Sequence, residues 1–273
     1  MGPTGGAEIA NALRKNALLA KSQNRTPSLR VLVCGRNRLE NGSSQAFADA
    51  FAEIGTLEQV KMFQNGIRME GIENIANGLR NNKNLLLLDL QDNTATEKGS
   101  RAIARALPSW PKLEHLNLSD CLLRPRGGIA IMTTLSKGSN KQLKSLKLQS
   151  NELDARSVDL LASAIERHLE HLQELELNGN RGDPEDDCYD RIRKALQRWD
   201  HEDALDELDD MEEFDPDEED EDDEDDDDEE GVDEEEQVSG IVKNDARREA
   251  ADPVTIDKEE DQDLANAIDK LKV

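Results

Sequence analysis

Apolar residues recur along the first two thirds of the chain in one short, fixed pattern. Six segments carry leucine or another apolar residue at their first, fourth and sixth positions, an Asn or Cys at the ninth, and most often an apolar residue at the eleventh. The ninth positions, which we call anchors, are Asn37, Asn65, Asn93, Cys121, Asn151 and Asn180. The anchors are 28, 28, 28, 30 and 29 residues apart, which is the signature of a structural repeat.

Helical periodicity follows the anchors. In the clearest case Phe47, Ala50, Phe51 and Ile54 fall on one face of a helix. The ladder itself has the form L-x-x-L-x-L-x-x-N/C-x-L of the leucine-rich repeat, and a repeat of 28–30 residues has room for a full helix. We therefore predict an α/β solenoid of ribonuclease-inhibitor-like repeats, with parallel strands on its concave side and helices on its convex side.

Both ends of the predicted solenoid, residues 1–200, are atypical. At the C-terminal end a helix carries Ile192, Ala195, Leu196 and Trp199 at helical spacing, so we expect residues 183–200 to cap the open core. At the other end, a helix with an apolar face of Ile9, Ala10 and Leu13 opens the chain without a preceding ladder. We therefore expect N-terminal repeats to be missing.

Negative charge is concentrated in one segment. Residues 202–236 hold 27 Asp and Glu and no Lys or Arg, which equals the whole formal charge of −27. We expect a disordered acidic tail over 201–236, because self-repulsion is strong and there is little apolar surface to bury. Residues 237–273 are expected to be mostly disordered, with a short amphipathic helix over 257–272. Lys243 lies in a loose SUMO-acceptor pattern.

Other compositional features narrow the class of protein. Cys34 and Cys121 occupy ladder positions, so we expect buried free thiols and a reducing compartment. No run is long and apolar enough for a membrane span, and no Gly-rich phosphate-binding motif is present. The histidines show no metal-ligand spacing, and basic stripes with interleaved aromatics are absent. We predict no metal site, no cofactor and no nucleic-acid partner.

Side chains between the ladder leucines face the predicted concave surface, because strand side chains alternate. Residues next to the anchors form a rim, which includes Asp120 and Arg124. The mixed charge of both regions favours a polar protein interface. The candidate partner-binding residues are Arg36, Arg38, Lys61, Gln64, Arg68, Asp89 and Asp92.

Four longer runs resemble the Ran GTPase-activating protein family. They are Cys34-Gly-Arg-Asn-Arg-Leu-Glu-Asn-Gly42, Gln64-Asn-Gly-Ile-Arg68, Leu88-Asp-Leu-Gln-Asp-Asn93 and Glu176-Leu-Asn-Gly-Asn-Arg181. The resemblance implies a protein that binds Ran-GTP and accelerates its hydrolysis in nucleocytoplasmic transport. It implies an activator without an active site of its own, which orients the catalytic glutamine of the GTPase and inserts no arginine finger.

The resemblance also has consequences for the site and the setting. The family residue nearest the chemistry is an Asn of an N-N-G-x-G-P motif, of which only Gly2-Pro3 stands here. We therefore predict no catalytic residue in this chain, which is N-terminally truncated relative to the family. The seven candidates are expected to bind and position Ran. The resemblance implies a cytoplasmic protein, found also at the nuclear envelope.

Two other interpretations stay open. An acidic leucine-rich protein that binds histones would share the acidic tail, but its repeats are shorter, roughly 23–24 residues against the 28–30 of this chain. A generic interaction scaffold would show no selectivity for a GTP-bound GTPase. The acidic tail is either a solvated segment or a segment that attracts basic surfaces, such as those of Ran-binding proteins or importins.

Overall fold

The computed structural model describes residues 1–212. The predicted features of residues 213–236 and 237–273, including the helix over 257–272 and the modification of Lys243, lie outside the described part. No helix in residues 1–212 is long and apolar enough to cross a membrane.

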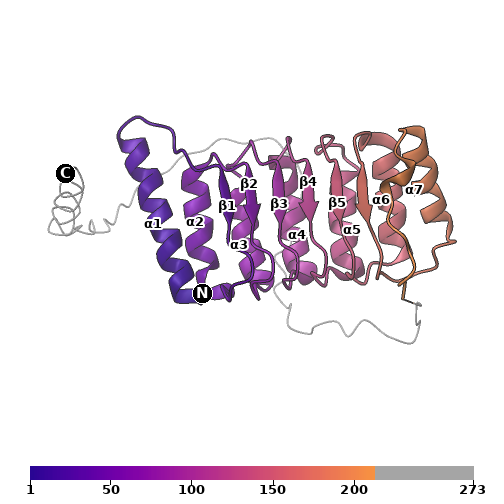
Figure 1. Cartoon of the computed structure of the whole chain (residues 1–273), viewed down its shortest axis with the longest axis horizontal. Helices are drawn as coiled ribbons and strands as arrows, with labels where there is room; N and C mark the ends of the chain where they lie inside the picture. Colours follow the sequence, from indigo (N-terminus) through magenta and orange to yellow (C-terminus); the bar gives the residue numbers. More distant parts are fainter. Residues whose placement is uncertain (213–273) are drawn as a thin grey trace, which may run out of the picture. The chain divides into compact units, whose positions relative to one another are not determined.

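The ladders form one parallel sheet whose strands follow each other in chain order (Figure 1). Val31 pairs with Gln59, Gln59 with Leu87 and Leu87 with His115, so the register advances by one repeat at each step. The predicted repeat spacing is thus the register of the sheet. The strands are β1 (Val31–Val33), β2 (Gln59–Lys61), β3 (Leu87–Asp89), β4 (His115–Asn117), β5 (Ser145–Lys147) and β6 (Glu174–Glu176).

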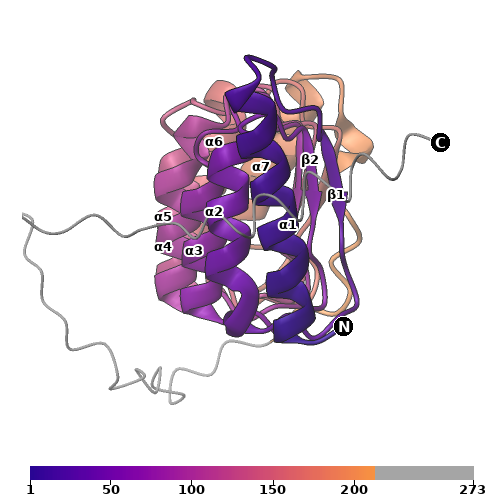
Figure 2. The same cartoon turned by 90° about the vertical axis from the view of Figure 1, so that its left-hand side faces the viewer.

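Within residues 1–212, helices cover one side of this sheet and none of them covers the other side (Figure 2). Each helix packs against the next one along the chain, because each crossover returns to the neighbouring position. The helices are α1 (Pro3–Ser22), α2 (Ser44–Ile54), α3 (Met69–Leu79), α4 (Thr96–Ala106), α5 (Arg124–Leu135), α6 (Ala155–His168) and α7 (Asp187–Arg198), with short 3-10 helices η1 (Asn41–Ser43), η2 (Leu107–Ser109) and η3 (Glu202–Ala204). The predicted α/β solenoid is confirmed.

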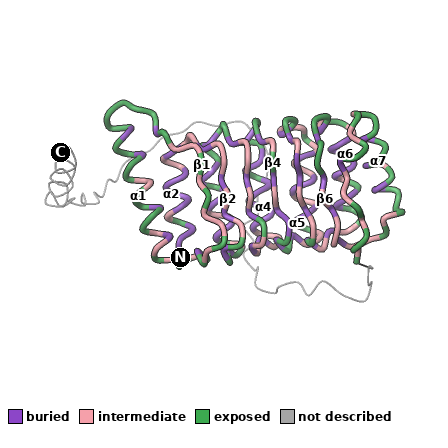
Figure 3. The backbone as a smooth tube through the Cα atoms, in the orientation of Figure 1, coloured by how far each residue is buried: buried purple, intermediate pink, exposed green. Residues whose placement is uncertain are grey.

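The core lies between the two layers and runs through the described repeats (Figure 3). Its centre is the ladder itself: Leu88, Leu116 and Leu146 occupy equivalent places in successive strands and are almost fully buried. Burying one such side chain contributes roughly 1.5–3 kcal/mol. Repetition of this layer supplies the stability that a single repeat lacks.

The anchor asparagines connect one repeat to the next through buried hydrogen bonds. The Asn93 side-chain nitrogen donates to the carbonyls of Leu90 at 2.7 Å and Met62 at 3.1 Å. Its oxygen accepts from the backbone nitrogen of Ile67 at 3.0 Å and of Asn65 at 3.3 Å. The amide therefore satisfies backbone groups at the bend that no strand partner reaches.

The N-terminal helix differs from its predicted packing. Ile9, expected on the buried face of α1, is exposed, and the buried residues of this helix are Gly6, Ala10, Ala17 and Ala20. Small residues face the core because the helix approaches closely: a Cβ on Gly6 would lie 2.7 Å from Cδ2 of Leu39. Helical periodicity alone does not distinguish a stripe of small residues from the larger apolar residues beside it.

The C-terminal boundary also differs. Residues 201–212, predicted as the start of the disordered acidic tail, run parallel to β6 and form bridges from Leu205 to Leu175 and from Glu212 to Arg181. Leu205, Leu208 and Met211 pack against the core. Backbone bonding to the open edge of β6 and this apolar contact outweigh the repulsion between the acidic side chains.

Candidate functional site

Two adjoining regions carry the candidate residues. The sheet face is the side of the sheet away from the helices, and the rim is the row of turns that follows the strands, at the lower edge in Figure 1. In the rim, the residue before each of the first five anchors has a positive φ. These residues are Arg36 (57°), Gln64 (53°), Asp92 (55°), Asp120 (55°) and Ser150 (53°).

The rim turns are held in register by backbone bonds. Arg36 N donates to Phe63 O at 2.9 Å, and Gln64 N donates to Gln91 O at 2.8 Å. Asp92 N continues the series to Ser119 O at 3.0 Å. Because backbone bonding fixes each turn, the rim offers its side chains from a rigid frame, which lowers the entropic cost of binding a partner.

A groove of about 640 Å³ runs along the N-terminal part of the rim. It contains three of the predicted residues, Arg38, Gln64 and Asp92, which come from three successive turns. The structure thus brings these three side chains to one surface. The complete lining is Asn37, Arg38, Glu40, Gln64, Asn65, Gly66, Asp92, Asn93, Thr94, Asp120 and Leu122.

The other four predicted residues lie outside this lining. Lys61 and Asp89 are register partners on the sheet face, and Arg36 and Arg68 are on the rim. Burial raises the pKa of Asp89 above its usual range, and the Gln91 N–H and the nearby lysines oppose that change. The carboxylate is therefore partly desolvated already, which reduces the further cost of covering it with a partner.

None of the seven predicted residues takes part in an ion pair within residues 1–212. Within that part of the chain, Arg36, Arg38, Lys61 and Arg68 therefore keep their charges available, as do Asp89 and Asp92. Unpaired charges on a fixed frame are what an electrostatically complementary partner requires.

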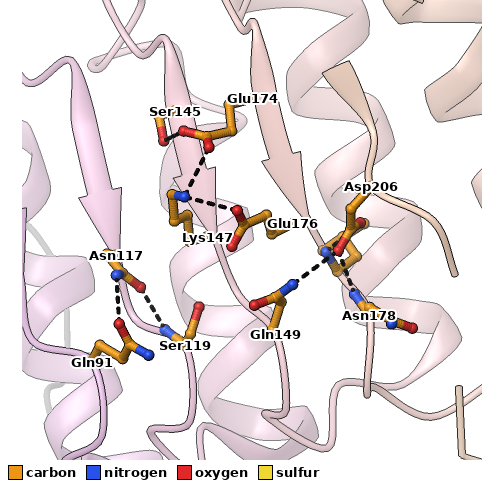
Figure 4. Close-up of polar contacts among 11 residues, drawn as sticks. Gln91, Asn117, Ser119, Ser145, Lys147, Gln149, Glu174, Glu176, Asn178 and Asp206 are labelled. Carbon is orange, nitrogen blue, oxygen red and sulfur yellow. Dashed lines mark hydrogen bonds and ion pairs between the residues drawn. The ribbon is translucent and has the colours of Figure 1, made fainter. Parts of the chain in front are cut away.

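The C-terminal part of the sheet face has a different arrangement (Figure 4). The Lys147 ammonium group lies between two carboxylates, 2.8 Å from Glu174 and 2.7 Å from Glu176. Burial opposes but does not outweigh these contacts, which raise the pKa of Lys147. Hydrogen bonds from Lys147 and Ser145 lower the pKa of Glu174.

The segment that covers β6 completes this network. The Asp206 carboxylate accepts from Leu177 N at 2.9 Å, from Asn178 N at 3.1 Å and from the Gln149 side chain at 3.2 Å (Figure 4). A carboxylate with three donors is well satisfied and rigid. The charged groups of this part of the face therefore already have bonded partners within the chain.

Eight of the eleven residues that line the groove were not among the seven candidates, and three of these eight carry a charge or an exposed apolar side chain. Sequence reasoning did not select Glu40 and Leu122, and it placed Asp120 on the rim without including it as a candidate, yet all three line the groove. Glu40 and Leu122 also have positive φ, of 48° and 51°. The sequence did hold a signal for both residues, because each lies close to an anchor. Glu40 follows Asn37 by three residues, and Leu122 follows Cys121 directly.

Comparison with known proteins agrees with the repeat architecture. Residues 111–132 match the family model described as Leucine Rich repeat. The chain is 40% identical over 201 residues to Ran GTPase-activating protein 1 of Saccharomyces cerevisiae, an alignment that covers 72% of this chain. It is 45% identical over 67 residues, or 24% of this chain, to Ran GTPase-activating protein 1 of Xenopus laevis.

This is a leucine-rich-repeat protein of the Ran GTPase-activating protein family. Human NACHT, LRR and PYD domains-containing protein 13 is also similar, at 30% identity over 62% of the chain. The chain spans about half the length of the yeast relative, 49%, and 12% of the frog relative. These relatives favour the Ran-related interpretation over a histone-binding or scaffold protein.

Proposed function

We propose that this protein is an activator of GTP hydrolysis by the small GTPase Ran and acts in nucleocytoplasmic transport. Two relatives named Ran GTPase-activating protein support the choice of Ran. The binding site is inferred from one observation. Charged side chains on the sheet face and rim of the first three repeats have no ion-pair partner within residues 1–212. Ran-GTP would contact Arg36, Arg38, Lys61, Gln64, Arg68, Asp89 and Asp92.

In this proposal the named residues bind and position Ran. Arg38 and Arg68 are on the rim, and Lys61 and Asp89 lie on adjacent strands. Charges of both signs on a rigid frame favour one orientation of the bound GTPase. Such a surface accelerates hydrolysis when the orientation favours the reactive arrangement of the GTPase's own groups.

Two further partners and a location belong to the proposal. The acidic run within 202–236 would attract basic surfaces of Ran-binding proteins or importins, since it holds 27 carboxylates and no cation. The protein would act in the cytoplasm, including the cytoplasmic side of the nuclear envelope. Free thiols at Cys34, Cys121 and Cys188 support a reducing compartment.

The test combines titration with single-turnover hydrolysis. Ran is loaded with a non-hydrolysable GTP analogue or with GDP for binding, and with GTP for the rate measurement. We expect tighter binding to the GTP-like form and faster hydrolysis, with a Ras-type GTPase as the unresponsive control. Equal affinity for both nucleotide forms would favour a generic scaffold, and binding without acceleration would reduce the function to Ran recognition.

A further inference from the structure

The rim groove carries more negative than positive charge. Three carboxylates line it, from Glu40, Asp92 and Asp120, against one guanidinium, from Arg38. The carboxylates come from the turns after β1, β3 and β4, so they are distributed along the groove. No side chain in residues 1–212 forms an ion pair with any of the three.

The groove wall also contains a buried anchor amide, that of Asn65, whose side-chain oxygen has no partner within the described residues. The side-chain oxygen of Asn65 accepts no hydrogen bond there, although Asn65 is about 1% exposed and is part of the groove lining. The corresponding oxygens of Asn93, Asn151 and Asn180 each accept from two backbone N–H groups. The Asn65 side-chain nitrogen donates to the carbonyls of Cys34 and Met62, at 3.0 and 2.8 Å, so the amide fixes the turn that carries Gln64 and forms a rigid part of the groove wall.

One apolar side chain stands among these acceptors. Leu122 is an exposed leucine that lines the groove, and it follows Asp120 by two residues in the chain. A basic side chain has the matching composition, because its aliphatic stem packs on apolar surface while its charged head remains among acceptors. A volume of about 640 Å³ admits such a side chain.

We propose that the groove receives a basic side chain of the bound GTPase, either a guanidinium or an ammonium group. Glu40, Asp92 and Asp120 neutralise its charge, and Leu122 contacts its stem. Arg38, at the same groove, then faces an acidic group beside that basic residue. This inference rests on the proposed function, because it assigns the chemistry of the contact that Ran makes with the rim.

Isosteric substitutions test the proposal with little effect on the fold. Asp120→Asn removes the charge at a positive-φ position that Asn tolerates well, and Glu40→Gln removes it at the other end of the groove. Asp203→Asn in η3 is the matched control, since it removes one exposed carboxylate away from the groove. Thermal unfolding of each variant verifies that the repeats remain folded.

The measurement is the affinity for Ran loaded with a non-hydrolysable GTP analogue, at two salt concentrations. For the Glu40→Gln/Asp120→Asn double variant we expect a loss of roughly 10- to 100-fold, a weaker salt dependence, and no change in the control. The single variant Glu40→Gln decides the question if the double variant unfolds.

Two other results overturn the proposal in distinguishable ways. If wild type binds and the groove variants bind equally well, the basic side chain does not enter the groove, but Ran recognition stands. If wild type does not bind Ran in its GTP-like form, the proposed function fails, and the groove inference fails with it.

Discussion

The two halves of the sheet face use charge in opposite ways. In the N-terminal half, Lys61 and Asp89 on the strands and Arg38 on the rim form no ion pair within the described chain. In the C-terminal half, Lys147 is held between Glu174 and Glu176. The same repeat architecture therefore presents charges without ion-pair partners in the N-terminal half, and charged groups already bonded within the chain in the C-terminal half.

This difference indicates where binding energy is available. A partner that covers Lys147 must desolvate a network that is already satisfied, so it gains little. A partner that covers Arg38 or Asp89 can supply a directly bonded counter-charge, which neither group has within residues 1–212. Residues 201–212 reinforce the contrast, because they cover the edge of β6 and occupy its donors.

The largest expected effect comes from reversing the open charges. Arg38→Glu with Arg68→Glu should weaken binding of Ran in its GTP-like form by about 100-fold, because two cations of the rim become repulsive. Lys147→Gln, which also removes a cation from this molecule, should change the affinity less than about 2-fold. Equal losses in titrations of the two variants would remove the distinction between the halves.

A second prediction concerns the segment that closes the C-terminal half. Asp206→Ala leaves the N–H groups of Leu177 and Asn178 without their acceptor, so it should lower the free energy of unfolding by about 1–3 kcal/mol. Asp203→Ala, which changes an exposed residue of η3, serves as the control, with an expected change within about 0.5 kcal/mol. Urea unfolding measures both, and an unchanged stability in Asp206→Ala would show that the segment is not held as described.

The third prediction is a pH dependence in the closed half. The folded-state pKa of Glu174 is lowered, so its contribution to stability is present above the usual Glu pKa and is lost as pH falls through the lowered value. Glu174→Gln should cost roughly 0.5 kcal/mol at pH 7 and nothing at low pH, since the pair is half exposed. Unfolding curves from pH 7 down to about pH 3 provide the measurement. If Glu174→Gln remained less stable than wild type at pH values below the pKa range of carboxylates, the loss of stability would not come from the ionised Glu174 carboxylate.

The smallest expected effect is on the reaction rates of two cysteine thiols at ladder positions, Cys34 and Cys121. Burial raises the pKa of Cys34 to about 11 and that of Cys121 to about 12. Both should therefore react slowly with a thiol reagent at about pH 8, with half-buried Cys34 faster than fully buried Cys121. Binding of Ran should slow the reaction of Cys34 further, because Cys34 belongs to the first repeat, whose surface Ran would cover. Mass spectrometry follows the rates, and a faster reaction of Cys121 would contradict the described burial.

Repetition made most of the fold predictable. The ladder leucines, the anchor asparagines and the helical faces of α2, α3 and α6 recur at one spacing, so each copy supports the others. Residues 201–212 escaped prediction because the apolar Leu205, Leu208 and Met211 stand among carboxylates, and the net charge of the segment favoured disorder. Their docking depends on the open edge of β6, a feature of the assembled sheet.

The sequence predicted where the candidate site lies, but only some of the residues that form it. Arg38, Gln64 and Asp92 flank anchors, so their place on the rim follows from the repeat. Glu40 and Leu122 reach the same groove through positive-φ turns that the ladder pattern does not specify. Whether a charge is paired depends on side chains from neighbouring repeats, as with Lys147 and Glu174, and periodicity does not contain that information.

The most direct test of the difference between the two halves is a hydrogen-exchange footprint of Ran, loaded with a non-hydrolysable GTP analogue, on this protein. We expect slower exchange in peptides that cover the first three rim turns, residues 34–40, 62–68 and 90–96. Peptides that cover residues 145–150 and 174–180 should exchange at the same rate with and without Ran. Protection of the C-terminal peptides without protection of the first three turns would contradict an open N-terminal half and a closed C-terminal half.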